Sequence, residues 1–570
     1  MESSSMASRG ELAFLDNDSS LMRTNITPKN VTLIACPWTF YERAEFLSQQ
    51  LGLGYVGAYT QKFGHRIIKY IDPMIAGGNA VSVPVQTRYQ STKRFGFSDE
   101  WIVAQIPDET DVIGVNAPFT DSRIVLYPLI RAIKRRFPNI PVVVGGVLAT
   151  TLPHQVIRES DADIVVKGEG EIAFSRILNG DPLETIPGLA FKKKGGSIFE
   201  NSLRSQQLKT VDQIPSPGYD FRPMEEYVKW SPRGDRADRT LSLISSRGCP
   251  FTCEFCSIPE KGQVWRPFTP ERVLGEIRAA IEAWGVNHIE FEDDNFTLQE
   301  PRALAVLQYL RDLRRRGYPI GCSFPNGIMI DRMSEGLAVL LKEAGADIIY
   351  LPVESGDTRV LLSMDKPQAQ KHLNTTLQVA KWCVDAGLQT SCFFICAYPG
   401  GRVNRKWRTE SHGAILQGLG YGETTEVSKW GKKGNYLLRQ GDELFMSGEN
   451  AASFETTLAY CKKLRAIGVH GITPLIATPY PGTELYEVCE RFGWLAFEDN
   501  HDVLTTVSYA GTMKADYIQI QTPWCSREEA LQRWQMMMDT FPTFHNVRKE
   551  EDTSLLTGKE LRGGSRASVL

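Results

Sequence analysis

The sequence predicts an α/β protein built from two units, an N-terminal doubly wound parallel sheet and a partial or complete α/β barrel. Short apolar runs alternate with longer amphipathic segments from residue 31 to residue 476, as the strand-helix repeats of parallel sheets do. The alternation is interrupted between residues 181 and 238, where Pro215 and Pro217 punctuate the chain. This interruption divides the repeats into two series.

Composition and charge exclude several classes of protein. The chain has 570 residues, of which 42% are hydrophobic and 23% are charged, as in folded globular proteins. A net charge of −3 provides no broad basic surface, so we expect no nucleic-acid partner. The sequence has no apolar run of about 18 residues and no signal-peptide pattern near its start. Eleven cysteines are too few for a secreted disulfide scaffold, so we expect a cytoplasmic protein without a membrane span.

The first series predicts a Rossmann-like domain over residues 30–180, preceded by a polar, disordered leader at 1–29 and followed by a linker with a small strand pair at 181–238. Helices are expected at 52–63 and 127–137. The strands are predicted in VTLIAC from Val31, HRIIKYID from His65, DVIGVNA from Asp111, PVVVGG from Pro141 and DIVVKGEGE from Asp163. Apolar runs of this kind are typical of strands buried on both faces.

The second series predicts a TIM-like barrel over residues 239–495, with chemistry at the carboxyl ends of its strands. Six strands are expected to begin near Leu241, His288, Cys322, Ile348, Thr390 and Ile472, with helices between them at 270–284, 301–316, 335–344, 368–386 and 451–467. Residues 496–570 are predicted to form a helical region and a disordered tail. Ser526 and Glu529 form a capping-box pattern at the start of that helix.

Three cysteines follow the first strand of the second series. Cys249, Cys253 and Cys256 have C-x3-C-x2-C spacing, which allows three thiolates to bind a 4Fe-4S cluster and leave its fourth iron open. A structural zinc site needs four ligands, and the nearest histidine in sequence is His288. The spacing therefore indicates an iron-sulfur cluster rather than zinc.

At these residues the chain resembles the radical S-adenosylmethionine (SAM) superfamily, whose motif has an aromatic residue before the last cysteine, here Phe255. The resemblance covers residues 241–494. It implies that SAM chelates the open iron beside Phe255 and is cleaved to a 5′-deoxyadenosyl radical. It also implies a low-potential electron donor such as flavodoxin or ferredoxin.

The same resemblance implies SAM contacts at two later strand ends. Glu292, Asp293 and Asp294 follow the second strand, where the family binds the methionyl ammonium, and which of these acids does so is left open. Glu354 and Ser355 follow the fourth strand, where the family binds the ribose and the methionyl carboxylate. The chain lacks the glycines of the glycine-glycine-glutamate motif that other members carry.

The N-terminal series resembles the cobalamin-binding domain that precedes many radical SAM domains. The matching stretches include VVVGGVLAT from Val142 and VVKGEGE from Val165. They imply cobalamin contacts at Gly145, Gly146, Thr150, Gly168 and Glu169. No histidine lies in a D-x-H-x-x-G pattern, so we expect no protein histidine on cobalt, and His154 is expected to cap a helix.

One segment does not fit the barrel repeat. Joining Gly400 to Glu449 restores the family pattern, so residues 401–448 are predicted to be an insert. With 8 basic and 5 acidic residues, nine glycines and no sustained period, the insert is expected to contribute little to stability. Two interpretations stay open: a disordered substrate lid, or an untranslated segment retained in the gene product.

Together the resemblances imply a cobalamin-dependent methyltransferase that acts on an unactivated carbon or phosphorus centre of a small-molecule substrate. An oxidative cyclase or ring-rearranging enzyme with the same cofactors is one alternative. A non-catalytic corrinoid or iron-sulfur sensor is another, but it leaves the strand-end acids without a role. The sequence identifies no catalytic side chain and does not name the substrate.

Overall fold

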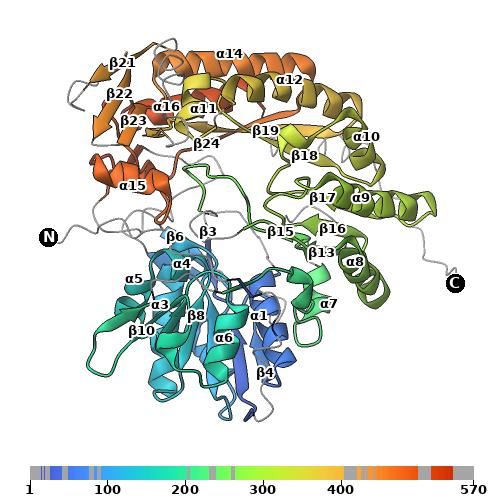
Figure 1. Ribbon diagram of the computed structural model, residues 1–570, viewed down its shortest axis with the longest axis vertical. Coiled ribbons are helices and arrows are strands. Elements are labelled where there is room, and N and C mark those ends of the chain that lie inside the picture. The colour runs from blue at the N-terminus through green and yellow to red at the C-terminus, as the bar shows by residue number, and fades with distance from the viewer. Residues whose placement is uncertain are drawn as a thin grey trace.

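Figure 1 shows the computed structural model of the chain, in which the N-terminal domain (blue to teal) lies against a barrel-like domain (green to orange). The structure describes residues 14–15, 18, 26–40, 49–75, 83–86, 91–201, 206–229, 239–257, 264–366, 368–403, 420–424, 431, 434–440, 443–497 and 515–542. The predicted C-terminal tail from residue 543 lies outside these residues. Among the described helices, none has the length and apolar character needed to cross a membrane.

The N-terminal domain contains a seven-stranded sheet in the order β11-β10-β9-β8-β7-β2-β4. Its strands are β2 (Asn30–Ile34), β4 (Arg66–Ile71), β7 (Val112–Asn116), β8 (Val142–Gly145), β9 (Ile164–Val166), β10 (Leu189–Lys192) and β11 (Ile198–Glu200). The first five are parallel, as predicted, while β10 and β11 are antiparallel. The strand pair predicted at 181–238 is present, but it extends this sheet, so the predicted end of the domain at residue 180 is too early.

Helices cover both faces of this sheet. Along β2, Val31 and Leu33 pack with α1 (Leu51–Lys62) and α6 (Glu171–Leu178). Ile34 lies on the opposite face, where it packs with α2 (Asp99–Ala104), α3 (Arg123–Arg136) and α5 (Pro153–Ser160). Burial on alternate faces explains why the strands are apolar throughout.

Part of the predicted leader has regular structure. β1 (Phe14–Leu15) pairs with β12 (Gln207–Leu208), and the Asp18 carboxylate contacts Lys62 Nζ at 2.6 Å. The prediction of a disordered leader is wrong for these residues. Residues 1–13, 16–17 and 19–25 lie outside the described part of the chain.

The second domain contains six parallel strands in two three-stranded sheets. They are β13 (Thr240–Leu243), β16 (His288–Phe291), β17 (Gly321–Ser323), β18 (Ile348–Glu354), β19 (Gln389–Cys396) and β24 (Gly471–Ile476). A parallel bridge between Cys322 and Ala346 joins the two sheets. Among the described residues β13 and β24 do not pair with each other, so the six strands form a partial barrel.

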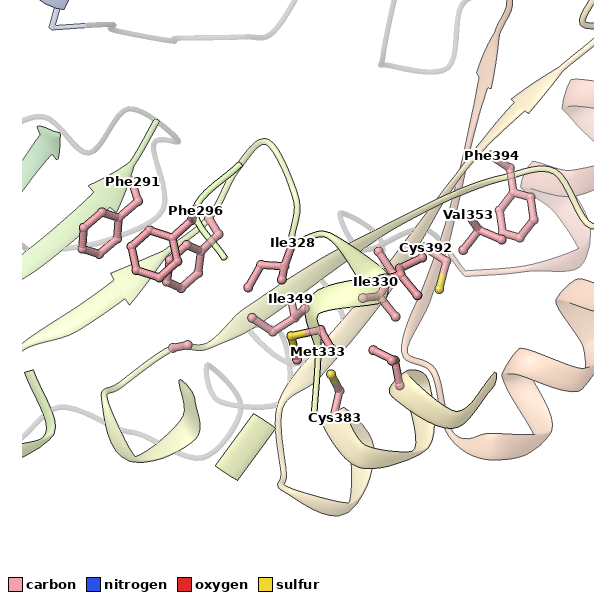
Figure 2. Close-up of a cluster of buried hydrophobic side chains, with 14 of the residues drawn as sticks. Phe291, Phe296, Ile328, Ile330, Met333, Ile349, Val353, Cys383, Cys392 and Phe394 are labelled. Carbon is pink, nitrogen blue, oxygen red and sulfur yellow. The ribbon is translucent and has the colours of Figure 1, made fainter. Parts of the chain in front are cut away.

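Helices lie on the outer side of the curved strands (Figure 1). They are α8 (Pro270–Trp284), α9 (Glu300–Arg315), α10 (Glu335–Glu343), α12 (Ala369–Asp385) and α14 (Ala451–Ile467), within two residues of their predicted bounds. α16 (Arg527–Thr540) begins at the predicted capping box of Ser526 and Glu529. The barrel core is apolar: Figure 2 shows Phe291 of β16, Ile349 and Val353 of β18 and Phe394 of β19 among its buried side chains.

The predicted insert contains a small sheet in the order β20-β23-β22-β21. Its strands are β20 (Gly400–Arg402), β21 (Tyr421–Thr424), β22 (Asn435–Gln440) and β23 (Glu443–Ser447). Leu438 and Phe445 are each 1% exposed and belong to the barrel core. The prediction that the segment has no periodic apolar face is wrong for these strands, whereas residues 404–419 and 425–430 lie outside the described set.

Helix α1 packs on both domains. Leu53 contacts the apolar cluster of its own sheet, whereas Tyr55 and Tyr59 belong to the cluster that forms the barrel core. The Gln49 side chain precedes the helix and pairs with the backbone of β13: its Nε2 donates to Thr240 O at 2.9 Å and its Oε1 accepts from Ser242 N at 3.1 Å. The N-terminal domain therefore covers the open edge of the barrel.

Candidate active site

The cysteine loop, residues 249–256, follows β14 (Ser246–Arg247). Cys249, Cys253 and Cys256 are partly buried and form no disulfide with one another or with another described cysteine. Asn295 Nδ2 donates a hydrogen bond to Cys249 Sγ at 2.9 Å, and Cys256 N donates to Cys253 O at 3.0 Å. Burial raises the pKa of Cys253 to about 11, so its thiol stays protonated until a metal supplies positive charge.

The donor set fits an iron-sulfur cluster. Among the described residues no three His, Cys, Asp or Glu side chains converge on a position for a single metal ion. A cubane cluster instead takes one thiolate at each of several irons, so its ligands need not converge on one point. Three thiolates from one loop meet that requirement.

Glu354 ends β18 at the same rim. Its φ of +67° is left-handed, which costs a residue with a Cβ roughly 1–3 kcal/mol and is found mainly where a site demands it. Lys366 Nζ contacts Glu354 Oε1 at 3.3 Å. Burial acts to lower the pKa of Lys366, but Glu354 and Cys253 outweigh it and the pKa is raised. The structure thus brings Glu354 to the cysteine loop, where the sequence predicts it.

Ser355 and Asp293 are placed differently from the expectation. The Ser355 hydroxyl is fully buried and lies 3.2 Å from Thr457 Oγ1 of α14. The Asp293 carboxylate is also buried and accepts hydrogen bonds from Ser245 and Ser246, in the segment that leads to the cysteines. Both side chains are therefore used in holding the barrel rim together.

Two other acids remain at the rim after β16. Glu292 and Asp294 are partly exposed, and the charge of Asp294 acts to raise the pKa of the Cys249 thiol, although burial is the largest cause of that increase. Of the three acids that the sequence leaves as alternatives for the methionyl ammonium, these two can reach a ligand and Asp293 is buried.

Phe255 lies edge-on to Tyr398, with ring centroids 6.4 Å apart. Between the cysteines, Glu254 is 2% exposed, and burial raises its pKa well above the usual value. Its carboxyl lies against Gly401 of β20, where an added Cβ would lie 1.8 Å from Glu254 Oε2. Sequence reasoning missed Glu254, Asn295 and Lys366, although an acid inside a cysteine motif is a usable signal.

The glycine loops of the N-terminal sheet lie at its carboxyl edge. A Cβ at Gly145 would meet no atom within 4 Å, so space is open there for a ligand. Gly146 has φ +109°, and a Cβ there would lie 2.4 Å from Ala117 O, so packing alone requires this glycine. Thr150 Oγ1 donates to Gly146 O at 2.7 Å and accepts from Gly168 N at 2.9 Å. These contacts join the two predicted cobalamin loops.

His154 does not cap a helix: it lies inside the first turn of α5, and its Nε2 is 2.6 Å from Glu200 Oε2.

Asn116, at the end of β7, accepts from Cys36 N at 3.0 Å and donates to Gln50 Oε1 at 2.5 Å. It stands where β2 and β7 meet and the strand order reverses, the position at which such sheets bind ligands.

The carboxyl edges of the two domains face each other. Gly482, in the turn after β24, packs on Thr151 of α4 (Val147–Thr151), since an added Cβ would lie 2.8 Å from Thr151 Cγ2. Glu169 and Glu171, after β9, form ion pairs with Arg247 and Arg266, which flank the cysteine loop. The two predicted cofactor sites are therefore on apposed rims.

Family models match both domains. Residues 40–178 match the B12 binding domain, and residues 243–402 match the radical SAM superfamily. The chain is a cobalamin-binding radical SAM protein. Its cofactors are thus a 4Fe-4S cluster, SAM and cobalamin, and the cysteine triad and the open space at Gly145 fit the first and the last of them.

Named relatives of this cobalamin-binding radical SAM protein include methyltransferases. It is 28% identical over 385 residues to an uncharacterized methyltransferase of Pyrococcus horikoshii, covering 66% of this chain and 69% of that protein. It is 27% identical over 379 residues to cytidylyl-2-hydroxyethylphosphonate methyltransferase of Streptomyces wedmorensis, covering 61% and 69%. A match to an anaerobic magnesium-protoporphyrin IX monomethyl ester cyclase of Cereibacter sphaeroides, 26% identical, covers 37% of this chain and 34% of that enzyme.

The fold also matches a solved structure. The radical SAM methyltransferase TsrM from Kitasatospora setae superposes with a TM-score of 0.56 at 15% identity, over 89% of this chain and 85% of that one. This similarity confirms the predicted fold class, a Rossmann-like domain followed by a TIM-like barrel.

Proposed function

We propose that the chain is a cobalamin-dependent radical SAM methyltransferase acting on an unactivated carbon or phosphorus centre of a small molecule. The observation that carries the proposal is the apposition of the two carboxyl edges, which would let a substrate between them reach both cofactors. When bound, SAM at the reduced cluster supplies a 5′-deoxyadenosyl radical, and cobalamin supplies a transferable methyl group. The coverage of the named methyltransferases supports this choice over a cyclase.

The side chains of the barrel rim would orient SAM. Glu292 and Asp294 offer carboxylates to the methionyl ammonium, and Glu354 offers a third acid on a left-handed backbone that fixes its direction. Asn295 and Lys366 place a hydrogen-bond donor and a cation beside the cysteines, which favours the more negative, reduced cluster. The rim thus supplies orientation and electrostatic stabilisation.

A low-potential electron donor such as flavodoxin or ferredoxin belongs to the proposal, because the radical forms only at a reduced cluster. A cytoplasmic location belongs to it too. None of the eleven cysteines, all of which lie in the described part of the chain, forms a disulfide, which supports a reducing compartment.

The test is an anaerobic incubation of the reconstituted chain with methyl-labelled SAM, hydroxocobalamin, a reductant and a panel of candidate substrates. We expect S-adenosylhomocysteine, 5′-deoxyadenosine and a labelled product. Glu354→Gln should lower deoxyadenosine formation at least tenfold with cobalamin content unchanged, while Asp385→Asn, which removes an exposed charge paired with Lys381, should match the wild type. Deoxyadenosine with an unlabelled, ring-altered product would identify a cyclase, and no SAM turnover would identify a sensor.

A further inference from the structure

Two buried arginines stand directly opposite each other at the base of the cysteine loop. β14 pairs antiparallel with β15 (Arg266–Pro267), and Arg247 and Arg266 are partners in that register. Their side chains are 10% and 6% exposed. Like charges facing each other across a strand pair are destabilising, and buried ones more so, unless anions neutralise them.

The neutralising anions come from the other domain. Arg247 contacts Glu171 at 2.7 Å and Glu169 at 3.5 Å, and Arg266 forms an ion pair with Glu169. The two glutamates are 7% and 6% exposed. The Arg247 guanidinium lies 4.7 Å from the ring centroid of Tyr55 on α1. Two positive and two negative charges thus form one buried, neutral group, which we call the interdomain ion-pair cluster.

This cluster continues into the predicted cobalamin loops. Glu169 directly follows Gly168, whose N–H donates to Thr150 Oγ1, and Thr150 in turn donates to Gly146 O. On the barrel side, Arg247 precedes Cys249 by two residues. Hydrogen bonds, ion pairs and two short stretches of chain therefore connect the glycine loop at Gly146 to Cys249.

We propose that Glu169, Glu171, Arg247 and Arg266 couple occupancy of the cobalamin site to the geometry of the cysteine loop, so that Glu169 is a positioning residue between the cofactors rather than a corrin contact. A ligand that orders the loops after β8 and β9 fixes the glutamates and, through them, the strand pair that carries the cysteines. By linkage, cobalamin and the 4Fe-4S cluster strengthen each other's binding by the same factor. The inference rests on the cofactor assignment and not on methyl transfer.

The test measures the dissociation constant of hydroxocobalamin for the full chain with and without the reconstituted cluster, and it needs no methyl acceptor. In the wild type we expect the dissociation constant of hydroxocobalamin to be lower by about fivefold or more when the 4Fe-4S cluster is present. Glu169→Gln and Glu171→Gln keep the side-chain shape but remove a charge, and should bring this ratio close to one. The matched control is Glu200→Gln, which removes charge contacts with Lys167 and His154 outside the interdomain ion-pair cluster and should keep the wild-type ratio.

A second measurement tests the same coupling without Glu169→Gln, in case that variant folds poorly. Hydroxocobalamin added to the cluster-free chain should slow hydrogen exchange in peptides spanning residues 246–256 in the wild type and in Glu200→Gln, but not in the milder Glu171→Gln. A wild-type ratio of one, or the same ratio and protection in the glutamate variants as in the wild type, would overturn the coupling. Failure of the wild type to bind hydroxocobalamin would overturn the cofactor assignment beneath it.

Discussion

Phe445 of β23 gives the sharpest test of whether residues 401–448 are part of the folded enzyme. Its side chain is 1% exposed and packs edge-on to Phe492, with ring centroids 5.1 Å apart. The guanidinium of Arg491 lies 4.9 Å from the same ring. Truncating a fully buried Phe to Ala costs about 3–5 kcal/mol through lost transfer free energy and the cavity left behind. Loss of the cation–π contact adds roughly 0.5–1 kcal/mol.

We therefore expect Phe445→Ala to lower the free energy of unfolding by about 5 kcal/mol. Trp494 stacks on Phe492 with ring centroids 4.9 Å apart, so tryptophan fluorescence during urea unfolding of the anaerobic apoprotein reports on this region. The control is Val339→Ala on α10, where the side chain is 46% exposed and the cost should stay under about 0.5 kcal/mol. Equal urea midpoints for the two variants would refute the packing inferred for β23.

Three further changes test the rim and the domain interface. Asn295→Ala removes the N–H donor to Cys249 and should lower the cluster's midpoint potential by about 40 mV, equivalent to ~1 kcal/mol for one electron, in a redox titration followed by electron paramagnetic resonance. Lys366→Met leaves the Glu354 carboxylate buried without its cation, so the free energy of unfolding should fall by about 3–5 kcal/mol, whereas Lys366→Arg should retain most of it. Burial raises the pKa of Asp72 from 3.8 to about 6, so the folded state binds the proton more tightly than the unfolded state and the wild type loses stability as pH rises through that range. Asp72→Asn does not titrate. The free energy of unfolding of Asp72→Asn minus that of the wild type should therefore rise by roughly 1.4 kcal/mol between pH 5 and pH 8 in urea titrations.

Local patterns were sufficient to predict the parallel strands of both domains and the barrel helices. The barrel helices begin and end within two residues of the predicted positions, because capping residues such as Ser526 and apolar periodicity are local properties of the chain. The cysteine loop is predicted for the same reason, since its three cysteines lie within eight residues. Glu354 is predicted at the same rim as the cysteines because the carboxyl ends of parallel strands meet at one end of a barrel.

Non-local contacts explain what the sequence did not predict. Asp293 is adjacent to two other acids in the chain, and only the fold shows that Ser245 and Ser246 surround it. The apolar residues of β22 and β23 alternate over only a few positions, and glycines and charged residues on either side make this alternation hard to detect. The packing of Phe445 against Phe492 is a contact that the local sequence does not show. The segment predicted as a linker, residues 181–238, contains β10 and β11 of the sheet. Antiparallel strands at the edge of a parallel sheet break the strand-helix repeat, so the repeat does not predict that they belong to this domain.

The distance between the two cofactor sites is set by helix packing as well as by loops. Helix α1 presents Leu53 to its own sheet and Tyr55 to the barrel core, so neither domain can shift without exposing apolar surface on one side of this helix. Gln49 adds two hydrogen bonds that fix the register of β13 against the N-terminal domain. Since β13 and β14 precede the cysteine loop in the chain, the contacts that close the barrel edge also help to hold this loop against the N-terminal domain, where Glu169 and Glu171 pair with Arg247 and Arg266. An enzyme that passes one substrate between a radical source and a methyl donor requires such a fixed separation, because small displacements of reacting groups cost orders of magnitude in rate.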